Sequence, residues 1–458
     1  MGNATISRRA ALAALAAGAT ARTAVARTRA RRPNVLFILA DDLGVHDISC
    51  FGRPDFQTPH IDTLARDGVK LTASYANSCT CSPTRTALLS GRYQYRLPVG
   101  NYDPLIRANI GFPPEHPTLA SLLRNAGYRT GLIGKWHLGV APLFGPLKSG
   151  YDEFFGLMGG AIDYFSHDLG TLAGPPRTPD LYENETPVVR EGYATDLFTE
   201  RALAFIEANR ARPFFLSLHY NAPHWPWQSR TDPGAPRAND FHFDGGSPSV
   251  YAQMMAALDE GVGAALAALD THGLRENTIV IFTSDNGGER FSYQWPLRGE
   301  KTTLYEGGIR VPTLVRWPGG LPANSTCDGV NITMDWLPTL LRVAGARPHP
   351  RYPSDGADIM RMLAGAPPRE RTLHWRAVDQ AAARRGQWKY LRFGDLEYLF
   401  DLNSDPGERA NLRQRHADVF ESLRSAYRSW DASMLPIPDD ARIDPAILRR
   451  LEALRPPY

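Results

Sequence analysis

The residues best suited to chemistry gather around one cysteine. Cys81 opens the run CSPTRTALLSGR, in which Pro83 suits the first turn of a helix and Gly91 its end. A helix that begins at Cys81 would stabilise negative charge at its N-terminus, and Arg85, one turn further on, can point back to the same place. From the residues alone, the segment predicts either a reactive thiol at an anion-binding site or a buried structural cysteine.

A lysine and a histidine lie two positions apart in the run GKWHLG. Lys135 and His137 flank Trp136, and side chains alternate along an extended backbone. We therefore expect an ammonium and an imidazole on the same side of this segment. A strand end with a solvated lysine is the alternative that the run allows on its own.

Acidic and amide side chains follow two apolar runs. Asp41 and Asp42 come directly after residues 34–40 (NVLFILA), and Asp285 and Asn286 follow the run TIVIFT. Their oxygens are hard ligands that suit Ca²⁺ or Mg²⁺ better than Zn²⁺. Adjacent aspartates can share one ion only where the strand alternation ends, as it should here. Turn or helix-cap chemistry is the alternative for each pair.

These segments resemble the signatures of the sulfatase family. The first signature, C-x-P-x-R followed by L-L-x-G-R, matches at Cys81, and residues 127–139 are similar to the second. In that family a formylglycine-generating enzyme oxidises the cysteine before folding. One hydroxyl of the hydrated aldehyde attacks sulfur, and the other helps to expel sulfate. The resemblance therefore implies hydrolysis of an aryl or carbohydrate sulfate monoester to an alcohol and inorganic sulfate.

The resemblance also implies roles for single residues. One Ca²⁺ would be held by Asp41, Asp42, Cys81 in its modified form, Asp285 and Asn286. Lys135 and Lys301 would contact sulfate, and His137 would take the diol proton when sulfate leaves. His224, in the run NAPHWP, would contact sulfate and protonate the leaving oxygen. Structural ion pairs are expected instead for the charged residues near Lys301, namely Arg298, Glu300 and Arg310.

The resemblance covers about residues 33–412, including the closing segment at 398–408. Two departures are minor: His60 stands where Asn is frequent, and Cys79 lies unusually close to Cys81. The chain has four cysteines, which are too few for a disulfide scaffold. We expect Cys79 to pack in its loop, because a bridge between such near neighbours is geometrically awkward.

Strand and helix signals alternate from residue 33 to about residue 345, which predicts an α/β fold with a large, mainly parallel sheet flanked by helices. The resemblance implies the alkaline-phosphatase-like sulfatase fold. Expected strands include 34–40, 129–133, 214–218, 278–283 and 313–317, and expected helices include 118–126, 195–209 and 250–269. A Pro-rich connection then separates this catalytic domain (33–345) from a smaller C-terminal α+β domain (346–458), with strands near 387–392 and 398–402 and a helix near 416–430.

The N-terminal segment predicts export. Arg8 and Arg9 precede an apolar run at 10–17, and small residues at 24–26 offer a cleavage site. Residues 1–26 thus read as a twin-arginine signal peptide, with the export machinery as a transient partner and a periplasmic or extracellular destination. Cleavage would remove Arg8, Arg9 and Arg22, which together account for the net charge of +3. A neutral mature chain gives no indication of nucleic acid, and no apolar stretch is long enough to predict a membrane-spanning helix.

Two alternatives remain open on the sequence. A phosphonate monoester or phosphodiester hydrolase of the same superfamily would share the nucleophile and the metal, because its substrate is also a tetrahedral monoanion. A non-catalytic protein that binds a sulfated glycan should have lost part of the set, and none is lost. The leaving alcohol would face loops at 163–167 and 225–227, whose aromatic residues suit a sugar ring or an aryl group equally.

Overall fold

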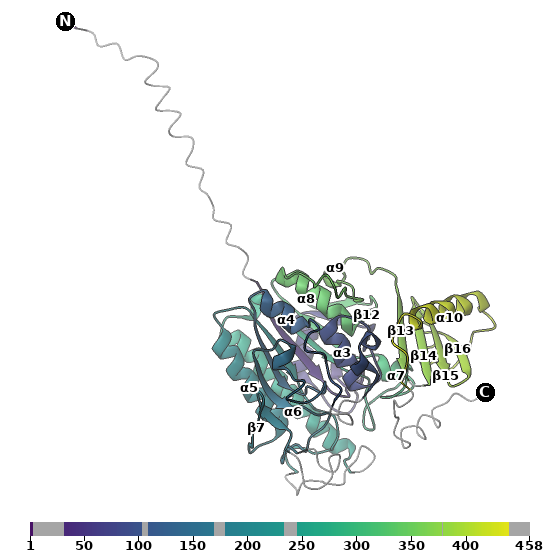
Figure 1. The fold of residues 1–458 in the computed structure, drawn as a ribbon, viewed down its shortest axis with the longest axis horizontal. Coiled ribbons are helices and arrows are strands. Elements are labelled where there is room, and N and C mark those ends of the chain that lie inside the picture. Colours follow the sequence, from purple (N-terminus) through teal and green to yellow (C-terminus); the bar gives the residue numbers. More distant parts are fainter. Residues whose placement is uncertain (3–31, 103–108, 169–178, 233–244, 378, 439–458) are drawn as a thin grey trace. The chain divides into compact units, whose positions relative to one another are not determined.

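The computed structural model describes residues 1–2, 32–102, 109–168, 179–232, 245–377 and 379–438. Residues from Arg32 onward form one compact unit (Figure 1). Nearly all of the expected signal peptide lies outside the described residues, as do the last twenty residues of the expected C-terminal domain. Within the described ranges, the helices are all too short or too polar to cross a membrane.

Ten strands of the described chain form one large sheet. In spatial order they are β11 (Ser325–Cys327), β2 (Val69–Leu71), β10 (Thr313–Arg316), β9 (Thr278–Ser284), β1 (Asn34–Ala40), β8 (Phe214–His219), β4 (Arg129–Gly134), β5 (Glu153–Leu157), β6 (Leu181–Glu183) and β7 (Thr186–Pro187). The centre, from β9 to β5, is parallel. β10 pairs antiparallel with both of its neighbours, and β6 and β7 close the other edge antiparallel. The expected parallel core is confirmed, and its flanks make the whole sheet mixed.

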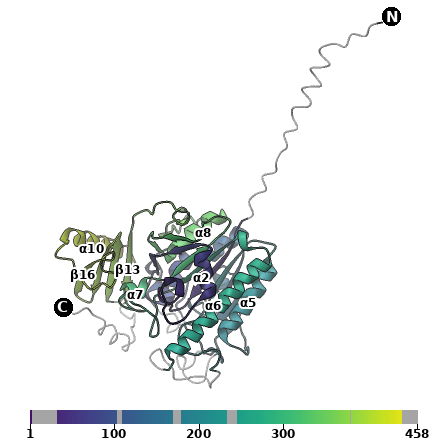
Figure 2. The same cartoon turned by 180° about the vertical axis from the view of Figure 1, so that it is seen from behind.

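Helices cover both faces of this sheet, which Figures 1 and 2 show from opposite sides. One face carries α2 (Pro59–Arg66), α5 (Ala194–Asn209) and α6 (Pro248–Thr271), and the other carries α3 (Cys81–Ser90), α4 (Leu119–Asn125) and α8 (Trp336–Ala344). Strand β1 explains the arrangement, because all seven of its residues are buried. Its even-numbered apolar residues pack with the first group of helices and its odd-numbered ones with the second. A strand buried on both faces is continuously apolar for this reason.

The helix boundaries follow local signals with small shifts. Helix α3 begins at Cys81 as expected, and Gly91 ends it with a φ of 65°. Helix α2 begins at Pro59, but the hydroxyl of Thr58 accepts from the backbone N–H of Ser49 instead of capping the helix. The helix ends at Arg66, two residues before Gly68. Helices α4, α5 and α6 lie within two residues of their expected bounds.

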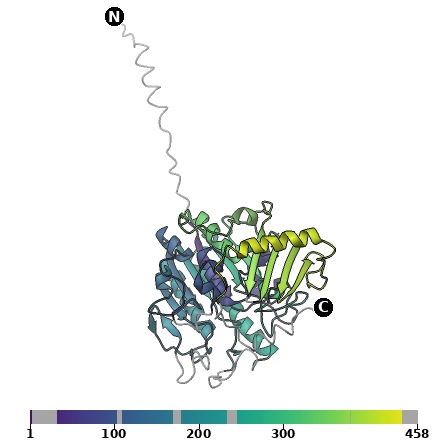
Figure 3. The same ribbon diagram turned by 45° about the vertical axis from the view of Figure 1, so that its right-hand side comes forward.

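The C-terminal part of the described chain forms a separate antiparallel sheet. Its strands are β13 (Thr372–Ala377), β14 (Gln380–Arg385), β15 (Trp388–Phe393) and β16 (Leu396–Asp401), and α10 (Ala417–Asp431) lies along one face (Figure 3). This sheet shares a hydrophobic cluster with Tyr75 and Ile309 of the larger part. Ile359 and Leu363, near the short α9 (Met360–Leu363), pack instead with α3, α4 and α8. The domain boundary at residue 345 stays a prediction.

Several short elements complete the described chain. They are β3 (Ser74–Tyr75), which pairs with β12 (Asn331–Ile332), α7 (Glu306–Ile309), and the 3₁₀ turns η1 (Ser49–Phe51), η2 (Gln94–Arg96), η3 (Pro98–Asn101), η4 (Leu147–Ser149), η6 (Arg275–Asn277) and η7 (Thr333–Asp335). The carboxyl ends of β1, β9, β8 and β4 lie at one edge of the parallel core. Apart from Cys81 and Arg85, which lie on α3, the residues expected to carry the chemistry follow these four strand ends.

Candidate active site

The ends of β1 and β9 bring four oxygen-bearing side chains together. Ala40 pairs with Ser284, so the residues that follow both strands emerge side by side. Asp42 has a φ of 61°, which breaks the strand alternation and lets two adjacent aspartates serve one site, as expected. The backbone N–H of Asp42 donates to Asp285 Oδ1 over 3.3 Å, and Asn286 Nδ2 donates to Asp42 Oδ1 over 2.7 Å.

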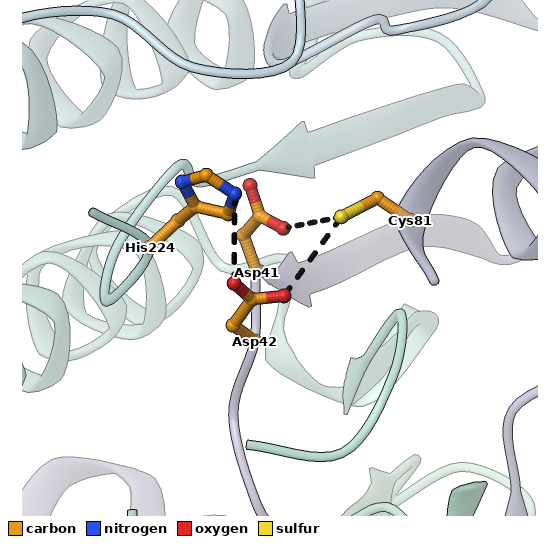
Figure 4. A group of neighbouring side chains, drawn as sticks. All are labelled: Asp41, Asp42, Cys81 and His224. Atoms are coloured by element: carbon orange, nitrogen blue, oxygen red, sulfur yellow. Dashed lines mark hydrogen bonds and ion pairs between the residues drawn. The ribbon is translucent and has the colours of Figure 1, made fainter. Parts of the chain in front are cut away.

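Cys81 lies at the first position of α3 and faces these carboxylates. Its Sγ lies 3.4 Å from Asp41 Oδ1 and 3.8 Å from Asp42 Oδ1. Figure 4 shows the side chains that converge here, Asp41, Asp42, Cys81 and His224. Burial and the Asp41 carboxylate raise the pKa of the Cys81 thiol well above its usual value. The unmodified thiol is therefore held neutral, which makes it a poor nucleophile.

Arg85 is buried and organises its neighbours. Its Nε donates to Asp285 Oδ2 over 2.9 Å, and Nη1 donates to the Lys135 carbonyl over 2.8 Å. Its Nη2 forms an ion pair with Asp285 Oδ2 at 2.8 Å. It points back toward the helix N-terminus, as the sequence predicts. These contacts fix the direction of one carboxylate and the backbone of Lys135.

Lys135 and His137 follow strand β4, but they are not equivalent. Lys135 is completely buried, and its Nζ donates to Asp41 Oδ2 over 2.6 Å. His137 has a φ of 59°, and its backbone N–H donates to the Met158 carbonyl over 3.1 Å. The expectation of extended backbone through His137 is wrong, because the strand ends at Gly134 and the chain turns. The catalytic role of His137 stays a prediction.

His224 and Lys301 meet on the other side of Asp42. Lys301 Nζ donates to Asp42 Oδ2 over 2.6 Å and lies 3.2 Å from His224 Nε2. His224 Nδ1 lies 2.6 Å from the Trp225 carbonyl, which can only accept, so Nδ1 carries the proton and Nε2 is the acceptor. Burial and the Lys301 ammonium lower the pKa of His224 well below its usual value. The imidazole is neutral and faces the ammonium.

The carboxylate and amide oxygens gathered here fit a hard divalent cation. Asp41, Asp42, Cys81 and His224 each offer one ligand atom within 4.8 Å of the others. Asn286 Oδ1 is buried and has no hydrogen-bond partner, which is the state expected of a ligand oxygen. Burial and the Asp41 carboxylate raise the pKa of Asp285 to about 6, although Arg85 opposes them. Three buried carboxylates thus repel one another, and a cation would relieve that repulsion.

Two further residues, Glu289 and His219, shape the site without having been expected, and Tyr164 of the expected 163–167 loop joins them. Glu289 Oε2 lies 3.8 Å from Lys301 Nζ, and the acidic run after β9 could have indicated it. His219, at the end of β8, places Nδ1 3.3 Å from the Lys135 carbonyl. The Tyr164 hydroxyl lies 2.9 Å from the carbonyl of His224. No local motif marks His219, because its partner Lys135 is distant in sequence.

Two residues of the expected substrate loops have structural roles. Asp163 Oδ1 accepts from the backbone N–H groups of Phe165 and Ser166, and Trp227 is 1 % exposed within the core. Trp225 is only partly buried, and its ring centroid lies 4.9 Å from that of His224. It remains a candidate neighbour of the leaving alcohol.

Of the structural ion pairs expected near Lys301, the one of Arg310 is confirmed, and those of Arg298 and Glu300 stay a prediction. Arg310 Nη1 lies 3.7 Å from Glu306 Oε2, and Arg298 stacks over the Tyr305 ring at 4.7 Å.

The site lies at the carboxyl edge of a parallel sheet and combines a helix N-terminus, buried carboxylates and two lysines. This combination is typical of a hydrolase that acts on a negatively charged ester. The chain belongs to the sulfatase family, whose model, described as Sulfatase, matches residues 33–346. It is accordingly a sulfuric ester hydrolase.

Named relatives match most of the chain. Arylsulfatase A of Homo sapiens is 33 % identical over 84 % of this chain and 84 % of its own length. N-acetylgalactosamine-6-sulfatase of Canis lupus familiaris is 32 % identical over 88 % of this chain and 87 % of its own length.

Solved structures share the fold. The crystal structure of Ps i-CgsB in complex with k-i-k-neocarrahexaose has a TM-score of 0.82 and 29 % identity, and the match covers 93 % of this chain and 98 % of that one. The phosphonate monoester hydrolase of Agrobacterium radiobacter has a TM-score of 0.59 at 20 % identity over 88 % of this chain and 96 % of its own, a likeness of fold alone.

Proposed function

We propose that the protein hydrolyses an aryl or carbohydrate sulfate monoester with a formylglycine made from Cys81 and one bound Ca²⁺. The observation that carries the proposal is the position of Cys81. Its sulfur lies at a helix N-terminus, 3.4 Å from Asp41, inside a buried cluster that also holds two lysines. Such a cluster stabilises an anion that has left water.

The site keeps the Cys81 thiol neutral, so the unmodified cysteine is a poor nucleophile, and conversion to formylglycine would provide a different one. Hydrated formylglycine would supply one hydroxyl that attacks sulfur and a second hydroxyl whose deprotonation releases sulfate. Asp41 and Asp42 face the Cys81 sulfur and would accept hydrogen bonds from those hydroxyls. Cys81 is 5 % exposed, so oxidation by a formylglycine-generating enzyme would have to come before folding.

The oxygen ligands would be those of Asp41, Asp42, Asp285 and Asn286. The bound Ca²⁺ would supply positive charge toward a sulfate oxygen and the developing transition state. Lys135 and Lys301 add fixed positive charge at places set by their contacts with Asp41 and Asp42. Because both ammonium groups are already oriented, they need no rearrangement when the sulfuryl group arrives.

We assign proton transfer to His224, His137 and Lys301. His224 Nε2 is an acceptor that faces Lys301 Nζ at 3.2 Å, so a proton for the leaving oxygen would start on the His224–Lys301 pair. His137 is our proposed acceptor for the proton removed as sulfate is released. It would have to be neutral at that moment to serve as a base.

Both classes of leaving alcohol remain within the proposal. The name of one relative, arylsulfatase A, indicates aryl sulfates for that protein, and the structure of Ps i-CgsB holds an oligosaccharide. The Trp225 ring beside His224 could pack against either a sugar or an aryl ring. A phosphonate monoester or phosphodiester hydrolase is the second candidate, because those substrates carry the same charge and shape at the reacting atom.

Export belongs to the same proposal. Residues 1–26 would direct the folded protein through the twin-arginine machinery to the periplasm or the medium. Export of a folded chain agrees with a modification that must precede folding.

The deciding experiment is a screen of hydrolysis rates with aryl, alkyl and carbohydrate sulfates, a phosphodiester and a phosphonate monoester. We expect sulfate release to exceed phosphoryl chemistry and Cys81→Ala to abolish it. Cys79→Ala is the matched control, since Cys79 is a buried cysteine of the same loop that lies outside the cluster. Faster hydrolysis of the phosphodiester or phosphonate than of every sulfate would favour the second candidate.

A further inference from the structure

The small C-terminal sheet reaches the active-site loop through one glutamine. Gln380 is the first residue of β14 and is 1 % exposed. Its Oε1 accepts from the backbone N–H of Leu304 over 2.8 Å, and its Nε2 donates to the carbonyl of Thr302 over 2.9 Å. A single side chain thus binds the backbone on both sides of Thr303.

The bound loop carries Lys301 and needs external support. Thr302 has a φ of 75°, a left-handed conformation that is strained for a residue other than glycine. The Thr302 N–H donates to the carbonyl of Cys79 over 2.8 Å, and the Lys301 N–H donates to the carbonyl of Gly288 over 2.9 Å. The loop is therefore held against the segments that lead into Cys81 and out of Asn286, and Gln380 binds the residues that follow, at Thr302 and Leu304.

We propose that Gln380 is a positioning residue that fixes Lys301 in the sulfate pocket and so makes the C-terminal sheet part of the catalytic apparatus. The inference rests on the proposed function, because that function assigns Lys301 to the sulfuryl group. Lys301 Nζ must lie 2.6 Å from Asp42 and 3.2 Å from His224 at once. A long side chain on a loose loop would not keep both contacts.

The size of the effect follows from the geometry. Replacing Gln380 with methionine keeps the length of the side chain but removes both hydrogen bonds. The Leu304 N–H would lose its partner within a buried part of the loop, and the strained Thr302 would be free to relax. A misplacement of the order of 1 Å in such a group can lower a rate about 100-fold, so we expect kcat/KM for sulfate esters to fall roughly 10–100-fold.

A double-mutant cycle separates positioning from simple support of the fold. The variants are Gln380→Met, Lys301→Ala and the double variant, measured by kcat/KM and thermal midpoint. Gln387→Met, at an exposed glutamine in the turn between β14 and β15, is the matched control and should resemble wild type. If Gln380 acts through Lys301, the double variant will be no slower than Lys301→Ala alone.

The outcomes are distinct. The inference is overturned if the fold-losses in kcat/KM of the two single variants multiply in the double variant. It is also overturned if Gln380→Met keeps the kcat/KM of wild type, or if Gln380→Met loses kcat/KM while Lys301→Ala does not. If Gln380→Met does not fold, Gln380→Glu replaces it, since a protonated carboxyl can make both bonds. Its activity relative to wild type should then rise as the pH is lowered, and a constant ratio would overturn the inference. A wild-type protein that releases no sulfate would instead defeat the proposed function.

Discussion

Replacing Lys135 with alanine should slow the hydrolysis of every sulfate ester by a similar factor. The Lys135 side chain is fully buried and its Nζ contacts Asp41 at 2.6 Å, so the position of the ammonium group is fixed before the substrate binds. Loss of one preorganised donor lowers the rate by about 10²–10³, which corresponds to roughly 3–4 kcal/mol of activation free energy. The sulfuryl oxygens are the same in all sulfate esters, and the loss should not depend on the leaving alcohol.

His224→Ala should behave differently. If the His224–Lys301 pair protonates the leaving oxygen, the loss will be large for alkyl and sugar sulfates, within the range of about 10²–10⁴ for general acid catalysis. A nitrophenolate leaves with little protonation, so its sulfate should be much less affected. The contrast arises because His224 Nε2 lies 3.2 Å from a proton donor, Lys301 Nζ.

The assay is kcat/KM for a nitrophenyl sulfate and for a sugar sulfate in each variant. Lys148→Ala is the control, because that lysine is 37 % exposed and lies 3.8 Å from Glu185 at the surface. An equal loss for both substrates in His224→Ala would refute the reasoning. His224 would then bind sulfate only, and the leaving group would need another proton donor.

Three further predictions concern the metal, the buried charges and export. Chelation of divalent ions should lower both activity and the thermal midpoint. The free energy of unfolding should fall by about 2.7 kcal/mol if the ion was at 100 times its Kd, and activity that depends on stoichiometric zinc would contradict the oxygen-ligand site. Burial and the Glu306 carboxylate raise the pKa of Glu408 to about 7 despite its contact with Lys389. The folded state thus holds a proton that the unfolded chain releases above about pH 4.5. The free energy of unfolding should therefore fall by roughly 3 kcal/mol as the pH rises from about 4.5 to 7, and denaturant titrations should show a weaker fall in Glu408→Gln; parallel curves would contradict this assignment. Changing Arg8 and Arg9 together to lysine should leave folded, active protein in the cytoplasm, and cell fractionation that finds normal export would rule out the twin-arginine route.

The sequence predicted the buried strands because a continuous apolar run is typical of a strand that is covered on both faces. β1 and β9 have the expected positions, and the helix at Cys81 begins and ends at the expected residues. The edge strand β2 was not predicted, since three residues carry no usable period. The antiparallel pairing of β10 was also beyond prediction, because pairing direction depends on how distant segments meet.

The site was predictable where chemistry lies in short motifs. Asp42 and Lys301 could be named from their neighbours in sequence, and the structure places both beside the Cys81 cluster. The error at His137 came from assuming that extended backbone continues past Gly134. The role of Gln380 could not be predicted for another reason. Its side chain binds backbone atoms that are distant in sequence, and Thr302 is 78 residues away. Contacts of that kind leave no local pattern.

The central claim is tested most directly by mass spectrometry of the peptide that contains Cys81, taken from protein that is fully active toward a sulfate ester. The account predicts an aldehyde at this position, in a fraction that follows specific activity from one preparation to the next. A fully reduced thiol in fully active protein would contradict the formylglycine mechanism.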